Sequence, residues 1–317
     1  MRRAVVAWVV VVVLAVGAAA GAVAALNATA FGAAGFVRIY LEALARGDAA
    51  GALSLPGVTV EPGLRDDFLV DAALAGPSDV HEITVAAGAA DTEIVTVAWA
   101  RGATEAVTAF TLERTGSRLG LFPRWAFAVS PVATLRPTIE HDPRFDLNGV
   151  PSVEDPAGFA VLVPGLYRAD HHSTYLRAES VDLVADRPGS ELDATLDVQP
   201  ADGFRAAIAA QLRVELDACA TQQVLFPTGC PLGHAIANRV VSAPAWSIVE
   251  YPDPAVGPGA EAGSWLAPVS FVSHLTVDVQ SLFDGSVSTF DEDLPVTATY
   301  VVAIGADDTT LGLALVE

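Results

Sequence analysis

The feature that most constrains this chain is a long apolar stretch close to its start. Residues Ala4 to Leu26 carry no charge and include an unbroken run of valines from Val9 to Val13. A helix rises about 1.5 Å per residue, so this stretch extends for about 34 Å and can cross a hydrocarbon core of about 30 Å. The stretch therefore predicts a single membrane-spanning helix.

The distribution of arginines predicts how that helix is oriented. Arg2 and Arg3 stand immediately before the apolar stretch, and the next basic residue is Arg38. Because basic residues stay on the cytoplasmic side, we expect a cytoplasmic N-terminus and an exported remainder. We therefore expect a single-pass protein of the cell membrane whose C-terminal domains lie outside.

A cleaved secretory signal is the alternative interpretation of the same segment. Ala28-Thr29-Ala30 has the small-x-small form of a cleavage site, which would leave Phe31 as the first residue. The apolar core of a signal peptide usually spans about 7–15 residues, and this stretch is longer. The length favours an uncleaved anchor, and both interpretations export the rest of the chain.

The exported part is strongly acidic. All 17 basic residues are arginines, and 38 Asp and Glu bring the net charge of the whole chain to −21. Such a domain repels phosphate backbones, so the charge argues against nucleic-acid binding. The expected partners are the membrane itself and an envelope protein or cell-wall component.

The two cysteines agree with export. Cys219 and Cys230 are the only cysteines, and an even count in an oxidising compartment favours a disulfide. A structural zinc site normally has four ligands, and only His234 lies nearby in the sequence. The spacing therefore favours a disulfide over a metal site.

Periodicity divides the remainder into domains, and the first extends from residue 31 to 133. The apolar spacing from Phe36 to Leu44 predicts an amphipathic helix, and shorter helices are expected at Ala49–Leu55 and Leu64–Leu74. Alternation with a period of two then predicts four antiparallel strands. Their expected ranges are Val80–Ala87, Thr92–Ala100, Glu105–Arg114 and Arg118–Val129.

Residues 134–200 and 201–317 are the two further domains expected. The first reads as a small all-β module with a hairpin turn at Asn148-Gly149. The second begins with a helix from Phe204 to Cys219 and continues with strands. The expected strands are Ala245–Tyr251, Trp265–Leu282, Leu294–Ile304 and Leu311–Val316, with a loop from Tyr251 to Gly263. The predicted fold class is therefore α+β, with residues 1–30 as cytoplasmic tip and anchor.

The segment from Phe36 to Leu53, with Arg46-Gly47-Asp48 at its centre, resembles the opening of nuclear-transport-factor-2-like domains. The resemblance implies a cone formed by a curved sheet around helices. Leu162-Val-Pro-Gly-Leu-Tyr167 resembles a turn of short envelope β modules. Together they resemble membrane-anchored envelope proteins of the teicoplanin-resistance-associated type. The arginine-only, Ala- and Val-rich composition resembles that of actinobacterial proteins.

Some members of the resembled family use an Asp-His pair in the cone pocket for acid/base chemistry. The corresponding candidates here are His81 on the first expected strand and Asp67, with Asp66 and Asp71 as further carboxylates. An isolated histidine at a strand edge is more often a surface residue. An acid/base site is therefore the alternative, not the leading hypothesis.

Other groups of histidines and aromatic residues have simpler explanations. His171 and His172 are adjacent, so on a strand they point to opposite faces and cannot share an ion without a bend. His141-Asp142 is the second dense pair. The tryptophans at 99, 125, 246 and 265 are expected in sheet cores, with sugar stacking as the alternative.

No catalytic, phosphate-loop or dinucleotide motif occurs in the sequence, and no cofactor or metal is expected. The leading hypothesis is a non-enzymatic, membrane-anchored envelope protein that acts as a scaffold or ligand-binding ectodomain. The alternative is a small-molecule binder or acid/base enzyme that uses a cone pocket of the first α+β domain.

Overall fold

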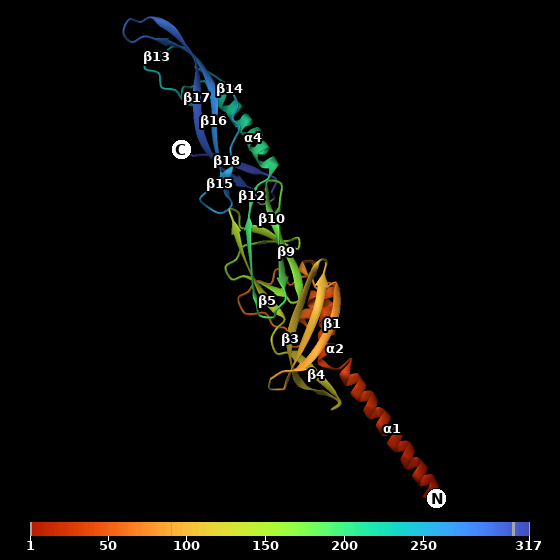
Figure 1. Cartoon of the computed structure of the whole chain (residues 1–317). Helices are drawn as coiled ribbons and strands as arrows, with labels where there is room; N and C mark the ends of the chain where they lie inside the picture. Colours follow the sequence, from red (N-terminus) through yellow and green to blue (C-terminus); the bar gives the residue numbers. More distant parts are fainter. Residues whose placement is uncertain (1, 90, 306–307, 317) are drawn as a thin grey trace. The chain divides into compact units, whose positions relative to one another are not determined.

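The computed structural model describes residues 2–89, 91–305 and 308–316 (Figure 1). The chain has an α+β fold with one apolar N-terminal helix and several antiparallel sheets. This confirms the predicted fold class at that level. The helices are α1 (Arg2–Ala28), α2 (Ala33–Ala45), α3 (Ala49–Leu53) and α4 (Asp202–Ala220), with a 3₁₀ turn at Asp71–Ala73.

The strands follow the sequence alternation closely. In the first half they are β1 (Asp79–Ala87), β2 (Thr92–Arg101), β3 (Thr104–Arg118), β4 (Phe122–Phe127), β5 (Val132–Glu140), β6 (Arg144–Leu147), β7 (Val150–Val153), β8 (Phe159–Leu162) and β9 (Gly165–His172). In the second half they are β10 (Leu176–Ala185), β11 (Glu191–Asp197), β12 (Gln199–Pro200), β13 (Arg239–Val240), β14 (Ala245–Glu250), β15 (Gly257–Pro258), β16 (Ser264–Gln280), β17 (Val287–Ile304) and β18 (Leu311–Leu315).

Two compact units make up the molecule. Unit 1 comprises Met1–Thr138, Arg144–Asp170 and Ser180–Leu196, and unit 2 comprises Ile139–Pro143, His171–Glu179 and Asp197–Glu317. Residues 134–200 thus contribute to both units. The three-domain division with limits near Thr134 and Pro200 stays an interpretation of the sequence.

The core of unit 1 forms where α2 packs on the sheet β1-β2-β3-β4. One face of β2, formed by Val95, Val97 and Trp99, is fully buried. The Tyr40 ring lies 6.0 Å from that of Phe110 on β3 and 5.1 Å from that of Phe127. Apolar residues at helical spacing meet alternating strand residues here, which is why both periodicities appear in the sequence.

The helix predicted over Leu64–Leu74 does not form, and that prediction was wrong. Only Asp71–Ala73 is helical, as a short 3₁₀ turn. The Arg65 amide donates to the carbonyl of Gly158, and the Arg65 carbonyl accepts from the amide of Ala160. Backbone groups that a helix would pair locally therefore bond to β8 and to the residue before it. Phe68 is buried against the rings of Phe145 and Phe159.

The hairpin turn predicted at Asn148-Gly149 is confirmed. It joins β6 to β7, and both residues have positive φ, 51° and 78°. These values are those of a type I′ turn, which matches the twist of the two strands and requires residues that tolerate the left-handed region. Asn148 also donates from its side-chain amide to the carbonyl of Ala73, at 2.8 Å.

Unit 2 combines α4 with a six-stranded sheet built around the long hairpin of β16 and β17. The helix predicted from Phe204 to Cys219 is confirmed as α4, and its buried face consists of Phe204, Ile208, Leu212, Leu216 and Cys219. The Phe204 ring meets those of Tyr175 and Trp265 at 5.5 and 5.9 Å. The predicted loop after Tyr251 is irregular except for β15, which pairs with β16.

Candidate membrane anchor and ligand pocket

Helix α1 presents apolar side chains in every direction. The segment Trp8–Asn27 has a mean hydropathy of 2.7, and none of it is buried in the chain. Leu14 and Val16 expose 66% and 63% of their surface. By length and composition the helix can cross a membrane, and a helix that is apolar all round needs an apolar environment on every side.

The C-terminal end of α1 is attached to the hairpin of β3 and β4. Asn27 donates from its side-chain amide to the carbonyl of Leu121, at 2.8 Å. The Phe31 ring packs at a tilt against that of Phe122, with 4.4 Å between the ring centres, and the Trp125 indole donates to the carbonyl of Phe31 at 3.0 Å. The sequence has no local signal for this junction, because Asn27 and Leu121 lie 94 residues apart.

His81 lies at an irregularity of the edge strand β1. Val80 pairs with Trp99 and Glu82 with Ala98, so His81 is the extra residue of a β-bulge. Its Nδ1 lies 3.3 Å from a carboxylate oxygen of Asp79, and about half of its side chain is exposed. Bulges re-aim side chains and recur near binding sites, and periodicity alone gives no sign of them.

A pocket of about 420 Å³ lies beside His81. Strand β1 contributes His81, Asp79 and Ile83, and α2 contributes Arg38 and Glu42. With Glu82 also in the lining, the pocket combines one cation, three carboxylates and an imidazole with several apolar side chains. Such a mixture could hold a small polar molecule and move a proton at its edge.

Asp67 does not line this pocket. It is held by Arg65, whose guanidinium lies 2.7 Å from it, and it accepts a hydrogen bond from the Ser152 hydroxyl at 2.8 Å. The hydrogen bond to Asp67 raises the pKa of Arg65. Asp71 accepts from the amide of Ala49, and Asp66 is exposed. The carboxylate beside His81 is that of Asp79.

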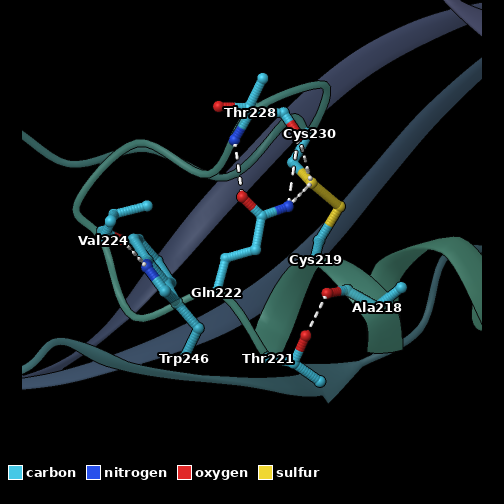
Figure 2. The surroundings of a disulfide bond; sticks show 8 residues. All are labelled: Ala218, Cys219, Thr221, Gln222, Val224, Thr228, Cys230 and Trp246. Carbon is cyan, nitrogen blue, oxygen red and sulfur yellow. Dashed lines mark hydrogen bonds between the residues drawn. A yellow bond between two sulfur atoms is a disulfide. The ribbon is translucent and has the colours of Figure 1, made fainter.

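The predicted pairing of Cys219 with Cys230 is present as a disulfide, with 5.8 Å between the Cα atoms (Figure 2). It joins the last turn of α4 to the segment before β13. The side chain of Gln222 donates to the carbonyl of Thr228 at 3.2 Å and accepts from its amide at 2.9 Å. These two hydrogen bonds brace the loop that the disulfide closes.

The other histidines singled out by the sequence occupy separate places. His171 is buried and His172 is exposed, as expected for adjacent strand residues. His141 lies 3.0 Å from Asp197, and the His234 ring stacks on Phe290 at 4.8 Å. Within the described residues, no cluster of His, Cys, Asp and Glu has the arrangement of a metal site. The four singled-out tryptophans, at 99, 125, 246 and 265, are buried in the cores, as predicted.

A charged cluster on β16 and β17 was missed by sequence reasoning. His274 Nδ1 lies 2.7 Å from Asp293, and its Nε2 lies 2.8 Å from Asp291. Thr276 donates to Asp291 at 2.8 Å. These hydrogen bonds, first that to Asp293, raise the pKa of His274. The polar alternation of β16 was visible in the sequence, but the register that sets it against the aspartates was not.

The chain was compared with protein families, curated sequences and solved structures. No protein family model, curated protein sequence or solved structure matches the chain.

Proposed function

We propose that this protein is anchored in the cytoplasmic membrane by α1 and presents both units outside the cell as a non-enzymatic envelope component. The observation that carries the proposal is the segment Trp8–Asn27, which has a mean hydropathy of 2.7 and no buried part in the folded chain. Exposing so much apolar surface to water is strongly unfavourable, and a bilayer removes that cost.

Two further features support an extracytoplasmic location. Disulfides persist in oxidising compartments and are rare in the cytosol, and unit 2 contains the pair Cys219–Cys230. The high negative charge keeps an exported domain soluble and disfavours nucleic acid as a ligand. Both point to a protein that acts at the outer face of the membrane.

Two reporters fused after Glu317 test the topology. Alkaline phosphatase should be active and a green fluorescent protein dark, because the first folds only outside the cytoplasm and the second only inside. As a matched pair, Arg2→Glu with Arg3→Glu should reduce phosphatase activity, and Arg38→Glu with Arg46→Glu should leave it unchanged. Fluorescence from the unaltered fusion would contradict the proposal. A mature chain that begins at Phe31 would show that residues 1–30 are a cleaved signal and not an anchor.

The proposal includes the role of the exported units. We take unit 1 to be a cone of the nuclear-transport-factor-2-like type, followed by a small β module, as in the envelope proteins that the sequence resembles. The packing of α2 on an antiparallel sheet of four strands supports this assignment. Crosslinking in intact cells followed by mass spectrometry should recover an envelope protein or wall precursor. Recovery of cytoplasmic proteins alone would contradict a scaffold role outside.

A second candidate function is small-molecule binding or acid/base chemistry in the pocket beside His81. The contact of His81 with Asp79 at 3.3 Å, at the edge of that pocket, favours it. A thermal-shift screen of small polar metabolites on the full chain tests it. A binder should lose its stabilising effect with His81→Ala and keep it with His172→Ala, since His172 lies outside the pocket. Equal losses in both variants would exclude this site.

A further inference from the structure

The turn between β3 and β4 exposes apolar side chains that the fold does not use. Leu119 and Leu121 expose 84% and 53% of their surface. Leu119 also has a φ of 56°, in the left-handed region that leucine rarely adopts. Asn or Gly would be the ordinary choice at such a turn position. A bulky apolar residue is therefore held at the tip of this hairpin at a cost in local strain.

This tip lies where the anchor leaves the membrane. The candidate span ends at Asn27, and Asn27 is the residue whose side chain donates to the carbonyl of Leu121. The Phe31 and Phe122 rings pack against each other beside this hydrogen bond, with 4.4 Å between their centres. A helix that ends at the edge of the hydrocarbon core thus holds the hairpin tip at the same level. Trp125, whose indole donates to the carbonyl of Phe31, is of a residue type that is enriched at that level of a membrane.

The stretch of sequence that contains the tip has a charge opposite to that of the chain as a whole. Residues 114–139 include four arginines and no Asp or Glu, within a protein of net charge −21. Arg118 and Arg124, which flank the turn, are both exposed. Among the described residues, neither of them forms an ion pair with a carboxylate. Guanidinium groups bind phosphate oxygens well, which suits a surface of lipid headgroups.

We propose that residues 118–124, the β3–β4 tip, dock on the outer leaflet of the membrane that α1 spans. Leu119 and Leu121 enter the interface between headgroups and acyl chains, and Arg118 and Arg124 contact lipid phosphates. The inference rests on the proposed function, since it requires α1 to be in the bilayer. Its consequence is a second membrane contact, which sets how unit 1 faces the membrane surface.

The other strongly apolar tip is a useful contrast. Between β16 and β17, Leu282 and Phe283 expose 75% and 99% of their surface. That turn contains Asp284 and no basic residue, so its charge does not favour an anionic lipid surface. Exposure alone is therefore not the basis of the assignment, and Phe283 provides an aqueous reference position.

Spin labels on single introduced cysteines test the proposal in the full chain. The native cysteines are bonded to each other, so a label reacts only at Val12→Cys, Leu119→Cys or Phe283→Cys. The protein is reconstituted in vesicles of phosphatidylcholine and phosphatidylglycerol. Collision with oxygen compared with a water-soluble nickel chelate reports the depth of each label. We expect position 12 in the hydrocarbon, position 119 at the interface and position 283 in water.

The outcomes separate the two proposals. A lipid signal at position 12 with an aqueous signal at position 119 would overturn the docking inference and leave the anchor intact. An aqueous signal at position 12 would overturn the proposed anchor itself. The label at position 119 is also measured in the variant Leu121→Ser, as a control for a local effect of the label itself. Because this variant lacks one apolar side chain at the tip, the label should lie less deep in the membrane.

Charge reversal tests the role of the arginines. With Arg118→Glu and Arg124→Glu, the label at position 119 should become several-fold more accessible to the nickel chelate. The matched variant Arg187→Glu with Arg239→Glu changes the net charge equally but leaves residues 118–124 unaltered, and it should leave the signal unchanged. Equal signals in both variants would show that Arg118 and Arg124 do not contribute to membrane docking.

Discussion

At the scale of single residues, His274 shows how a common side chain acquires a defined electrostatic role. The imidazole lies between two carboxylates on the neighbouring strand, those of Asp291 and Asp293. On its other side, β14 places the uncharged Ser247 opposite it. Hydrogen bonds from Thr276 and then His274 lower the pKa of Asp291. In the folded chain the protonated imidazole therefore stabilises the ionised carboxylates, and the carboxylates stabilise the protonated imidazole.

The sign of the resulting pH dependence follows from the raised pKa of His274. Its ordinary value is 6.5, and hydrogen bonding to Asp293 and Asp291 raises the folded-state pKa above that. The stabilisation is complete below the unfolded pKa and is lost as the pH rises through the folded pKa. We expect the unfolding midpoint of unit 2 to fall over this window in the native chain, and to fall less in His274→Gln.

A histidine NMR titration measures the same effect directly. The His274 resonance should titrate above 6.5, and Asp293→Asn should bring it back toward that value. Asp278→Asn is the matched control, because Asp278 lies on the same strand as His274 but accepts a hydrogen bond from the Thr289 hydroxyl instead. A His274 pKa that does not respond to Asp293→Asn would contradict the assignment.

At the scale of elements, α2 joins parts of unit 1 that are distant in the sequence. The Tyr40 hydroxyl donates to the carbonyl of Val163 at 2.7 Å and also lies 3.2 Å from that of Pro131. Burial raises the pKa of Tyr40 well above its ordinary value. The helix therefore contributes both apolar packing against β2 and β3 and a buried polar connection to the segment after β8.

Tyr40→Phe should destabilise unit 1 by about 1–3 kcal/mol, because a buried carbonyl loses its hydrogen-bond donor while the ring packing is kept. Chemical denaturation followed by tryptophan fluorescence measures the change. Tyr251→Phe is the control, since the Tyr251 hydroxyl bonds to Asp217 at an exposed position. Its effect should stay below about 1 kcal/mol. Equal effects of the two substitutions would mean that burial of the Tyr40 bond has no energetic weight.

At the scale of the whole molecule, the two units are stabilised by different means. Unit 1 has the aromatic cluster around Tyr40 and Phe127 and contains no cysteine. Unit 2 adds the disulfide at the end of α4, which closes a loop with a sequence separation of 11. A cross-link over so short a loop stabilises by roughly 3 kcal/mol in the chain-entropy model.

Cys219→Ala with Cys230→Ala should therefore lower the stability of unit 2 by roughly 3 kcal/mol. Hydrogen exchange followed by mass spectrometry should show faster exchange in α4 and residues 221–232, with α2 and β2 unchanged. The free-thiol content of the unreduced, denatured native protein should be zero. Gln222→Ala, which removes the loop bracing but keeps the disulfide, should have a smaller effect in the same peptides.

The sequence by itself determined the elements whose signals are local. The apolar stretch from Ala4 to Leu26, the stripe of α4 and the alternation of β2 each report a periodicity that one element carries within itself. The turn at Asn148-Gly149 was also predictable from local sequence, because few residue types accept positive φ. The disulfide was predictable because the chain has two cysteines, which leaves one possible pairing.

Only the tertiary structure decided what depends on partners distant in the chain. The spacing in Leu64–Leu74 predicts a helix, yet the backbone groups of Arg65 bond to Gly158 and to Ala160 on β8. The bulge at His81, the carboxylates around His274 and the contact of Asn27 with Leu121 all follow from strand register or from packing across the fold. Such contacts are set by the burial of whole faces, and no short stretch of sequence contains both sides of them.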